Sequence, residues 1–231
     1  MFVTFGILTN NKTQQVVDII QSIENMDIPL DSYEIIVVGN VDLHEDFYQN
    51  FKIIHDKTVE SKNWITKKKN LVVQHSSGSD DSLVIIGKDY IKYDKNWFKG
   101  LLEFHKINDF DIFMNQIHNE NGKRYLDWIW NHPILGNGRN IDYRIKGHPG
   151  MFAPGCITFA KKKVFKKYPF AERLVGLGKE SDIVWSKRAF SEFSYTFNIH
   201  SKCIAFGKGS NRFPKFRRKC VCDYCTSYKF N

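Results

Sequence analysis

The feature that most constrains the fold is a short apolar run at residues 83–86, which ends abruptly in Gly87, Lys88 and Asp89. The run has no polar alternation, and this is typical of a strand buried on both faces of a mostly parallel sheet. In open α/β sheets, ligands bind just beyond the carboxyl ends of such strands. Asp89 is therefore placed where a protein can hold a hard cation and a phosphate-bearing ligand.

Strand and helix signals alternate through the first hundred residues. Residues 2–8, 33–38 and 51–55 predict further strands, and apolar spacing predicts helices after residue 11, over 64–74 and from Asn96. Such alternation predicts a Rossmann-type, mostly parallel α/β sheet with helices on both faces. The trio at residues 9–11, Thr-Asn-Asn, is expected to cap the first helix.

The pattern changes after Phe110. Residues 111–117, 156–160 and 193–199 predict strands, and residues 131–150 predict a long loop. These segments predict a smaller, mixed portion beside the main sheet. We therefore expect one domain over residues 1–209, with halves 1–109 and 110–209, followed by a basic cysteine-containing tail at 210–231.

Composition narrows the partners and the compartment. The 231 residues carry 34 basic and 25 acidic side chains, for a net charge of +9, so nucleic acid, a membrane surface or nucleotide phosphates are all suitable anionic partners. No run approaches the roughly 20 apolar residues that span a bilayer, and the start lacks a signal-peptide pattern. Five cysteines, an odd number, favour a reducing setting, so we expect a cytoplasmic protein.

Two candidate metal ligands stand at strand ends. Asp89 is the first, because Mg²⁺ and Mn²⁺ commonly use one or two carboxylates together with substrate phosphates. His200 closes the last predicted strand and is a second candidate, since neutral imidazole binds divalent ions. A surface turn acid and a surface histidine are the alternatives for these two side chains.

A basic run precedes the strand that ends at Asp89. Lys67, Lys68 and Lys69 can neutralise a diphosphate, with Asn70 hydrogen-bonding nearby, or can form a solvated helix face. Spacing does not separate these two alternatives.

Three candidates belong to the second half of the chain. Asp182 begins a predicted helix, where it is either a general base or an acid favoured by the helix dipole. Trp128 and Trp130 either stack on an acceptor sugar ring or fill the core, which is the commoner use of tryptophan. Cys220, Cys222 and Cys225 are either free thiols or part of a zinc site, which needs a fourth ligand.

Taken together, these segments resemble the GT-A glycosyltransferases of the family-2 type over roughly residues 2–205. The similar segments are the first strand with residues 9–11, the basic helix at 64–70, the strand and aspartate at 84–90 with Trp97 downstream, the glycine-led strand at 155–160 and the Glu-Asp-like segment at 178–186. The chain departs from the family in three places. Lys88, Asp89 and Tyr90 replace an Asp-x-Asp motif, and Asn40 follows the second strand in place of an aspartate. Ser181 stands directly before Asp182 where the family has a glutamate, and Glu180 is displaced by one residue from that position.

The resemblance implies a metal-dependent glycosyltransferase that moves a sugar from a nucleotide-sugar donor to a hydroxyl of a glycan, protein or small molecule, with inversion and with Mn²⁺ or Mg²⁺ as cofactor. It implies a hexosyltransferase with Asp182 as base and Glu180 on the acceptor side. The residues implied to bind the nucleotide-sugar are Thr9, Asn10, Asn11, Asn40, Lys68, Lys69, Asn70 and Lys88.

Two other classes of function stay open at this point. A non-catalytic nucleotide- or carbohydrate-binding module on a degenerate transferase fold would account for the single acid of the aspartate motif. A nucleic-acid-binding protein would use the basic tail, but the strand–helix alternation would then have no purpose. We therefore expect no nucleic-acid partner.

Overall fold

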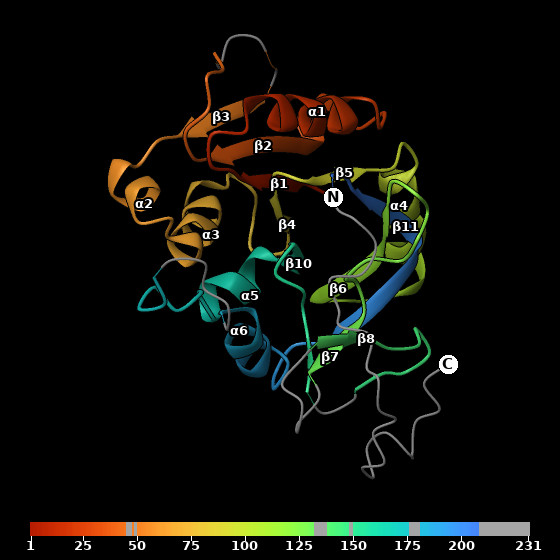
Figure 1. Cartoon of the computed structure of the whole chain (residues 1–231). Helices are drawn as coiled ribbons and strands as arrows, with labels where there is room; N and C mark the ends of the chain where they lie inside the picture. Colours follow the sequence, from red (N-terminus) through yellow and green to blue (C-terminus); the bar gives the residue numbers. More distant parts are fainter. Residues whose placement is uncertain (45–47, 49, 132–137, 148–149, 176–180, 208–231) are drawn as a thin grey trace.

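An eight-stranded sheet runs through the molecule in the order β3-β2-β1-β4-β10-β6-β11-β5 (Figure 1). The computed structural model describes residues 1–44, 48, 50–131, 138–147, 150–175 and 181–207. The predicted tail at 210–231, with its cysteine cluster, lies outside the described residues. The strands of this sheet are β1 (Val3–Leu8), β2 (Tyr33–Val38), β3 (Phe51–Ile54), β4 (Leu83–Lys88), β5 (Ile91–Tyr93), β6 (Ile112–Asn119), β10 (Ile157–Lys161) and β11 (Tyr195–Ala205).

The first four of these strands are parallel, as the alternation of strands and helices predicts. β1 lies between β2 and β4, with Val3 opposite both Tyr33 and Leu83, and β3 pairs with the outer side of β2. Every residue of β1 is buried, which explains why its sequence shows no polar alternation. The carboxyl ends of β1, β2 and β4 therefore meet at one edge of the sheet.

The strand direction reverses at β10, which runs antiparallel to β4 with Ile157 opposite Gly87. β6 is antiparallel to β10, and β11 is parallel to β6. Because of this reversal, the residues that enter β10 lie beside the residues that leave β4. One edge of the sheet thus receives chain from both halves of the sequence.

Helices cover both faces of the sheet, as predicted (Figure 1). One hydrophobic cluster joins α1 (Thr13–Glu24) and α4 (Trp97–Ile107) to one face. A second cluster joins α2 (Lys57–Ser61), α3 (Ile65–His75), α5 (Lys162–Lys167) and α6 (Ser181–Ala189) to the other face. The helix α3 packs closely on β1, because a Cβ at Gly6 would lie 2.4 Å from a methyl group of Val72.

A small second sheet accompanies β6 and β11, in agreement with the predicted mixed portion. It consists of β8 (Gly138–Asn140), β7 (Ile129–Asn131) and β9 (Met151–Phe152), in that order and antiparallel. The predicted loop at 131–150 therefore contains strand β8. Residues 132–137 and 148–149 of that loop lie outside the described residues.

The expected capping of the first helix is wrong. The N-cap of α1 is Lys12, which makes no side-chain capping bond, and the Thr9 hydroxyl instead donates to the carboxylate of Asp89. The helices α3 and α4 begin within one residue of their predicted starts, whereas the short helix α2 is not predicted by the sequence. Over the described part of the chain, no helix combines the length and apolar character needed to cross a membrane.

Candidate functional site

The candidate site begins where β1 and β4 end. The backbone N–H of Asp89 donates to the Leu8 carbonyl at 3.1 Å, which fixes Asp89 directly beside the end of β1. The Thr9 hydroxyl then donates to Asp89 Oδ2 at 3.0 Å. No described residue donates a hydrogen bond to the other carboxylate oxygen of Asp89. The carboxylate is therefore oriented by Thr9 and partly exposed at the sheet edge.

Lys68 supplies a buried positive charge to the same edge. Its side chain has no exposed surface, and its ammonium donates to the Thr9 carbonyl at 2.6 Å. Burial lowers the pKa of this ammonium, and the carboxylates of Glu60 and Asp89 oppose that shift. Thr9 is thus held from two sides, by Lys68 through its carbonyl and by Asp89 through its hydroxyl.

Asp182 reaches this edge from the other half of the chain. It lies in the first turn of α6 and forms an ion pair with Lys69, whose side chain is 2% exposed. Its carboxylate also lies against Gly155, because a Cβ at residue 155 would be 2.0 Å from Asp182 Oδ2. Adjacent lysines of α3 therefore place positive charge near two carboxylates: Lys68 lies near Asp89, and Lys69 pairs with Asp182.

Cys156 lies between the two halves of this edge. Its thiol is buried, and burial raises its pKa to about 12, with Lys88 opposing the shift and Asp182 adding to it. Both charged side chains are therefore close enough to influence the same thiol. The backbone N–H of Lys88 donates to the Cys156 carbonyl at 2.9 Å, which joins the end of β4 to the entry of β10.

The segment that leads towards α6 is tied to α3 by side-chain hydrogen bonds. Asn70 donates to the Phe170 carbonyl and to Glu172 Oε1, both at 2.9 Å, and accepts from the Phe170 N–H at 2.9 Å. The Thr66 hydroxyl donates to the Leu174 carbonyl at 2.9 Å, and Lys67 pairs with Glu172 at 3.1 Å. We call residues 168–174 the strap. The side-chain amide of Asn70, a predicted nucleotide ligand, is thus hydrogen-bonded to the strap through both its oxygen and its nitrogen.

Aromatic rings hold α6 against the strap and α5. Trp185 stacks on Phe165 and on Phe170, with ring centroids 5.3 Å apart in each case. The Trp185 indole N–H also donates to the Tyr168 carbonyl at 2.7 Å. This packing sets the position of α6 and hence of Asp182, three residues before Trp185.

The carboxylates at this edge of the sheet offer few ligands to a metal ion. Over the described residues, no group of three or more His, Cys, Asp or Glu side chains is arranged to hold a metal ion. Asp89 offers one carboxylate oxygen without a hydrogen bond from those residues, and Mg²⁺ is usually bound by one or two carboxylates together with phosphates and water. The donor set therefore fits a cation shared with a bound diphosphate.

Solved structures share this architecture. TarS (residues 1–349) of S. aureus, in complex with UDP-GlcNAc, aligns with a TM-score of 0.61 and 14% identity over 91% of this chain and 60% of its own. GalNAc-T7, with UDP, GalNAc and Mn²⁺, gives 0.65 and 10% over 91% and 44%. The mannosyltransferase PcManGT from Pyrobaculum calidifontis, in complex with GDP-Man and Mn²⁺, gives 0.58 and 11% over 93% and 58%.

The chain has the GT-A fold. It spans at most about 60% of the length of these structural neighbours. No protein-family model and no curated protein sequence matches it.

Within the GT-A fold, the sequence-predicted residues separate into those that meet at the edge and those that do not. Thr9, Lys68, Lys69, Lys88, Asp89 and Asp182 gather there. Asn10, Asn11 and Asn40 lie exposed at its rim, where the Asn11 N–H donates to the Asn40 carbonyl at 3.1 Å. Glu180 lies outside the described residues.

The predicted acceptor role of Trp128 and Trp130 is corrected by the structure. Neither indole has any exposed surface, so neither presents a ring face to a ligand. Trp128 packs on Tyr195 and Phe197, and its indole N–H donates to the Ile145 carbonyl at 2.8 Å. The core-packing alternative is therefore the correct one for both residues.

The predicted metal-ligand role of His200 is also corrected. β11 continues to Ala205 instead of ending near His200, and it is Ala205 that pairs with Ile91 close to Asp89. Five residues along a strand place His200 roughly 15 Å from that end. Its imidazole lies 3.8 Å from Glu103 of α4, far from the sheet edge.

Gly155 is the functional candidate that residue-by-residue reasoning missed. The sequence marks it only as the leader of a strand, because its neighbour Asp182 is 27 residues away. The close approach of its Cα to the carboxylate becomes visible only in the folded chain.

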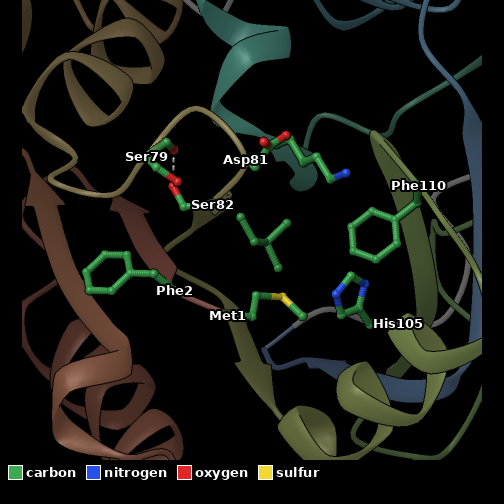
Figure 2. A pocket seen from close by; sticks show the side chains of 9 residues that line it. Met1, Phe2, Ser79, Asp81, Ser82, His105 and Phe110 are labelled. Atoms are coloured by element: carbon green, nitrogen blue, oxygen red, sulfur yellow. Dashed lines mark hydrogen bonds between the residues drawn. The ribbon is translucent and has the colours of Figure 1, made fainter.

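A cavity of about 290 Å³ lies at the opposite edge of the sheet (Figure 2). Figure 2 shows Phe2 and Ser82 on one side of it and His105 and Phe110 on the other, with Met1 between them. It adjoins the first residue of β4, Leu83, so roughly 20 Å of strand separates it from Asp89. Among the described residues, the side chains of the acidic pair before β4 form ion pairs with α5, Asp80 with Lys166 and Asp81 with Lys163.

Proposed function

We propose that this protein is a glycosyltransferase that moves a sugar from a nucleotide-sugar donor to an acceptor hydroxyl, with inversion. The observation that carries the proposal is the meeting of two carboxylates and several lysines at one edge of a GT-A sheet. Asp89 comes from the end of β4, and Asp182 comes from α6 across the strand reversal. Group transfer between two substrates requires a donor side and an acceptor side that face the same space.

The donor diphosphate belongs beside Asp89 in this proposal. The Lys88 side chain is partly exposed and makes no hydrogen bond or ion pair with the described residues, so its ammonium is available to a phosphate. Lys68 adds a buried charge behind Thr9. TarS, GalNAc-T7 and PcManGT are each described with a UDP- or GDP-containing ligand, and this supports a nucleotide-sugar donor here. Positive charge close to the leaving diphosphate stabilises the transition state.

We further propose that Asp89 holds Mn²⁺ or Mg²⁺ together with the donor diphosphate. GalNAc-T7 and PcManGT are described with Mn²⁺. When bound, the ion would supply positive charge against the departing diphosphate. Thr9 would keep Asp89 oriented for it, because its hydroxyl bond leaves the second carboxylate oxygen available.

Asp182 is the proposed general base. It takes the proton of the acceptor hydroxyl while the hydroxyl oxygen bonds to the anomeric carbon of the sugar. The bond from that carbon to the diphosphate breaks on the opposite face, and the diphosphate leaves with the electron pair. The anomeric configuration is therefore inverted, through an oxocarbenium-like transition state.

The acceptor is proposed to lie along α6. A hollow of about 410 Å³ is lined by Met151, Ser186, Phe190, Phe193 and Tyr195, among others. Ser186 lies one helical turn after Asp182, and its hydroxyl accepts from the Ala153 N–H at 2.9 Å. The hollow lies beside the same helix as the proposed base, although Asp182 itself does not line it. Its mixed aromatic and hydroxyl lining suits a ligand with both apolar and polar faces.

A non-catalytic binding module is the second candidate, because Asp89 is one carboxylate where an Asp-x-Asp motif has two. Such a module would bind the nucleotide-sugar and leave it intact. Incubation with UDP-GlcNAc or GDP-Man, followed by measurement of free UDP or GDP, separates the two functions. Release above the rate in buffer identifies an enzyme, even when water is the acceptor.

The first experiment is a thermal-shift screen of UDP, GDP, UDP-GlcNAc and GDP-Man, with and without Mn²⁺. A ligand that binds only the folded chain stabilises the folded state by about 2.7 kcal/mol at a concentration of 100 Kd. This stabilisation raises the melting temperature. No shift with any of the four ligands would contradict the proposed donor class.

The second experiment tests Asp182 as the base. We expect Asp182→Asn to abolish transfer and to leave nucleotide-sugar binding largely unchanged, since the amide cannot accept the proton as a carboxylate does. Asp81→Asn is a matched control, because that carboxylate is exposed at the opposite edge of the sheet. A fully active Asp182→Asn variant would remove Asp182 from the mechanism.

A further inference from the structure

Lys69 lies between the two halves of the candidate site with its ammonium enclosed by protein. The side chain is 2% exposed and forms an ion pair with Asp182 Oδ1. The same ammonium lies 4.2 Å from the centroid of the Phe170 ring, a geometry in which the ring face attracts a cation. Its surroundings differ sharply from those of an exposed helix lysine.

We propose that Lys69 is a positioning residue that holds Asp182 in place, and that it is not a ligand of the donor diphosphate. The inference rests on the proposed function only in taking Asp182 as the base. It also reassigns Lys69, which the resemblance groups with the nucleotide-binding residues.

Burial is the first argument. A buried ammonium loses its hydration and is stable only when it is paired, and removal of one partner from a buried pair leaves an uncompensated charge. If Lys69 turned towards a phosphate, Asp182 would lose this partner and Phe170 would lose the cation over its ring. Lys88 is partly exposed and free of described partners, so it can contact a diphosphate at no such cost.

The helix geometry is the second argument. Successive residues of an α-helix point about 100° apart, as follows from 3.6 residues per turn. The Lys68 ammonium reaches Thr9 on the donor side, and Lys69 consequently points towards the strap and α6. The two neighbouring lysines are therefore divided between donor and acceptor sides by the geometry of the helix.

The packing around the carboxylate is the third argument. Lys69 contacts Oδ1 of Asp182, while Oδ2 lies against the Cα of Gly155. Phe170, beneath the Lys69 ammonium, stacks on Trp185 of the helix that carries Asp182. The carboxylate is held from both sides, and the helix beneath it is fixed through the same aromatic ring.

The test compares Lys69→Met with Lys88→Met, two variants that each remove one ammonium. We measure the affinity for UDP or GDP by calorimetry and the turnover of donor hydrolysis at saturating donor. Lys69→Met should keep nucleotide affinity within about twofold of wild type and lower kcat by about 10²-fold, because a misplacement of about 1 Å costs that much. Lys88→Met should weaken nucleotide affinity. Equal loss of affinity in both variants would overturn the proposal.

A double-mutant cycle on thermal unfolding gives a second readout that needs no substrate. Lys69→Met should lower Tm strongly in the wild-type background and much less in the Asp182→Asn background, where no carboxylate is left unpaired. If Lys69→Met alone does not fold, the double variant should still fold. Additive changes in Tm, or a double variant as unstable as the single one, would overturn the pairing.

The two readouts distinguish the possible failures. Absence of nucleotide binding by the wild-type chain would contradict the proposed function, while the cycle would still report whether Lys69 and Asp182 are coupled. A coupled pair with wild-type kcat in Lys69→Met would show that the pair is purely structural and would overturn the positioning role.

Discussion

The contact between Gly155 and Asp182 allows the proposed base to be moved without changing its chemistry. A Cβ at residue 155 would lie 2.0 Å from Asp182 Oδ2, whereas ordinary contact begins at 3.4 Å. The variant Gly155→Ala therefore displaces the carboxylate by about 1.4 Å, the difference between these two distances. Gly155 has no positive φ, so alanine fits the backbone itself.

The expected cost follows from that displacement. A misplacement of about 1 Å at a reacting group costs on the order of 10²-fold in rate, so kcat should fall by at least about that factor. Tm should also fall, though less than in Lys69→Met, because the displaced carboxylate is moved against its ion pair with the buried Lys69 ammonium. Nucleotide affinity should stay unchanged, since Asp182 belongs to the acceptor side.

The assay is release of UDP or GDP from the nucleotide-sugar that gives the largest thermal shift. Gly87→Ala is the matched control, because a Cβ there would meet its nearest atom, Ile157 Cδ1, at an ordinary 3.6 Å. Both variants replace a glycine beside the β4–β10 junction, but only one of them moves the base. A Gly155→Ala protein with wild-type kcat would refute the assignment of Asp182 as base at this position.

Three further outcomes are expected. Asp89→Ala should remove the Mn²⁺-dependent part of nucleotide affinity, and calorimetry that gives equal affinities with and without Mn²⁺ in the wild-type chain would contradict this. Asn70→Ala should destabilise the chain by about 1–3 kcal/mol, because it leaves hydrogen-bonding partners on the strap unsatisfied. The variant should also turn over more slowly without binding UDP more weakly. Weaker UDP binding would indicate that Asn70 is a nucleotide ligand after all. Trp185→Ala should cost about 3–5 kcal/mol in urea unfolding, and a loss below 1 kcal/mol would show that the aromatic stack does not hold α6.

The strands of the sheet could be predicted because their burial leaves a direct trace in the sequence. β1, β2 and β4 are buried on both faces, so polar residues are absent from most of their length. Their order along the chain, separated by helices, then predicts parallel pairing. The direction of β10 leaves no such trace, because a buried strand has the same composition in either direction.

The burial of Lys68 and Lys69 could not be predicted in the same way. A run of three lysines on a helix is usually solvated, and here only Lys67 follows that rule in part. Asp182, the partner that stabilises the Lys69 ammonium, is 113 residues away in the sequence, so no local sequence pattern predicts the pair. Sequence periodicity indicates which residues of one helix are buried together, but it does not show which distant charges pair in the folded chain.

The two corrected roles have simple physical causes. Trp130 lies in β7 and Trp128 directly precedes that strand, and both belong to the hydrophobic cluster on one face of the main sheet. An aromatic-rich segment alone does not reveal this burial. The alternation of polar and apolar residues fades near residue 199, and this pattern predicts a strand end at His200. The strand continues because β11 pairs with β6 and β5 across a register shift.

The strand reversal at β10 has a consequence for how the protein acquires activity. The β1–β2 pairing joins residues 30 apart, but the β1–β4 and β4–β10 pairings join residues 80 and at least 70 apart, and the Lys69–Asp182 ion pair joins residues 113 apart. The site across the reversal is thus completed by a contact more distant in sequence than any of these strand pairings. Contacts between distant parts of a chain form slowly, because loop closure costs entropy before the contact repays it. The recovery of turnover during refolding should therefore lag behind the recovery of helical signal, which makes catalysis a sensitive reporter of the last step of folding.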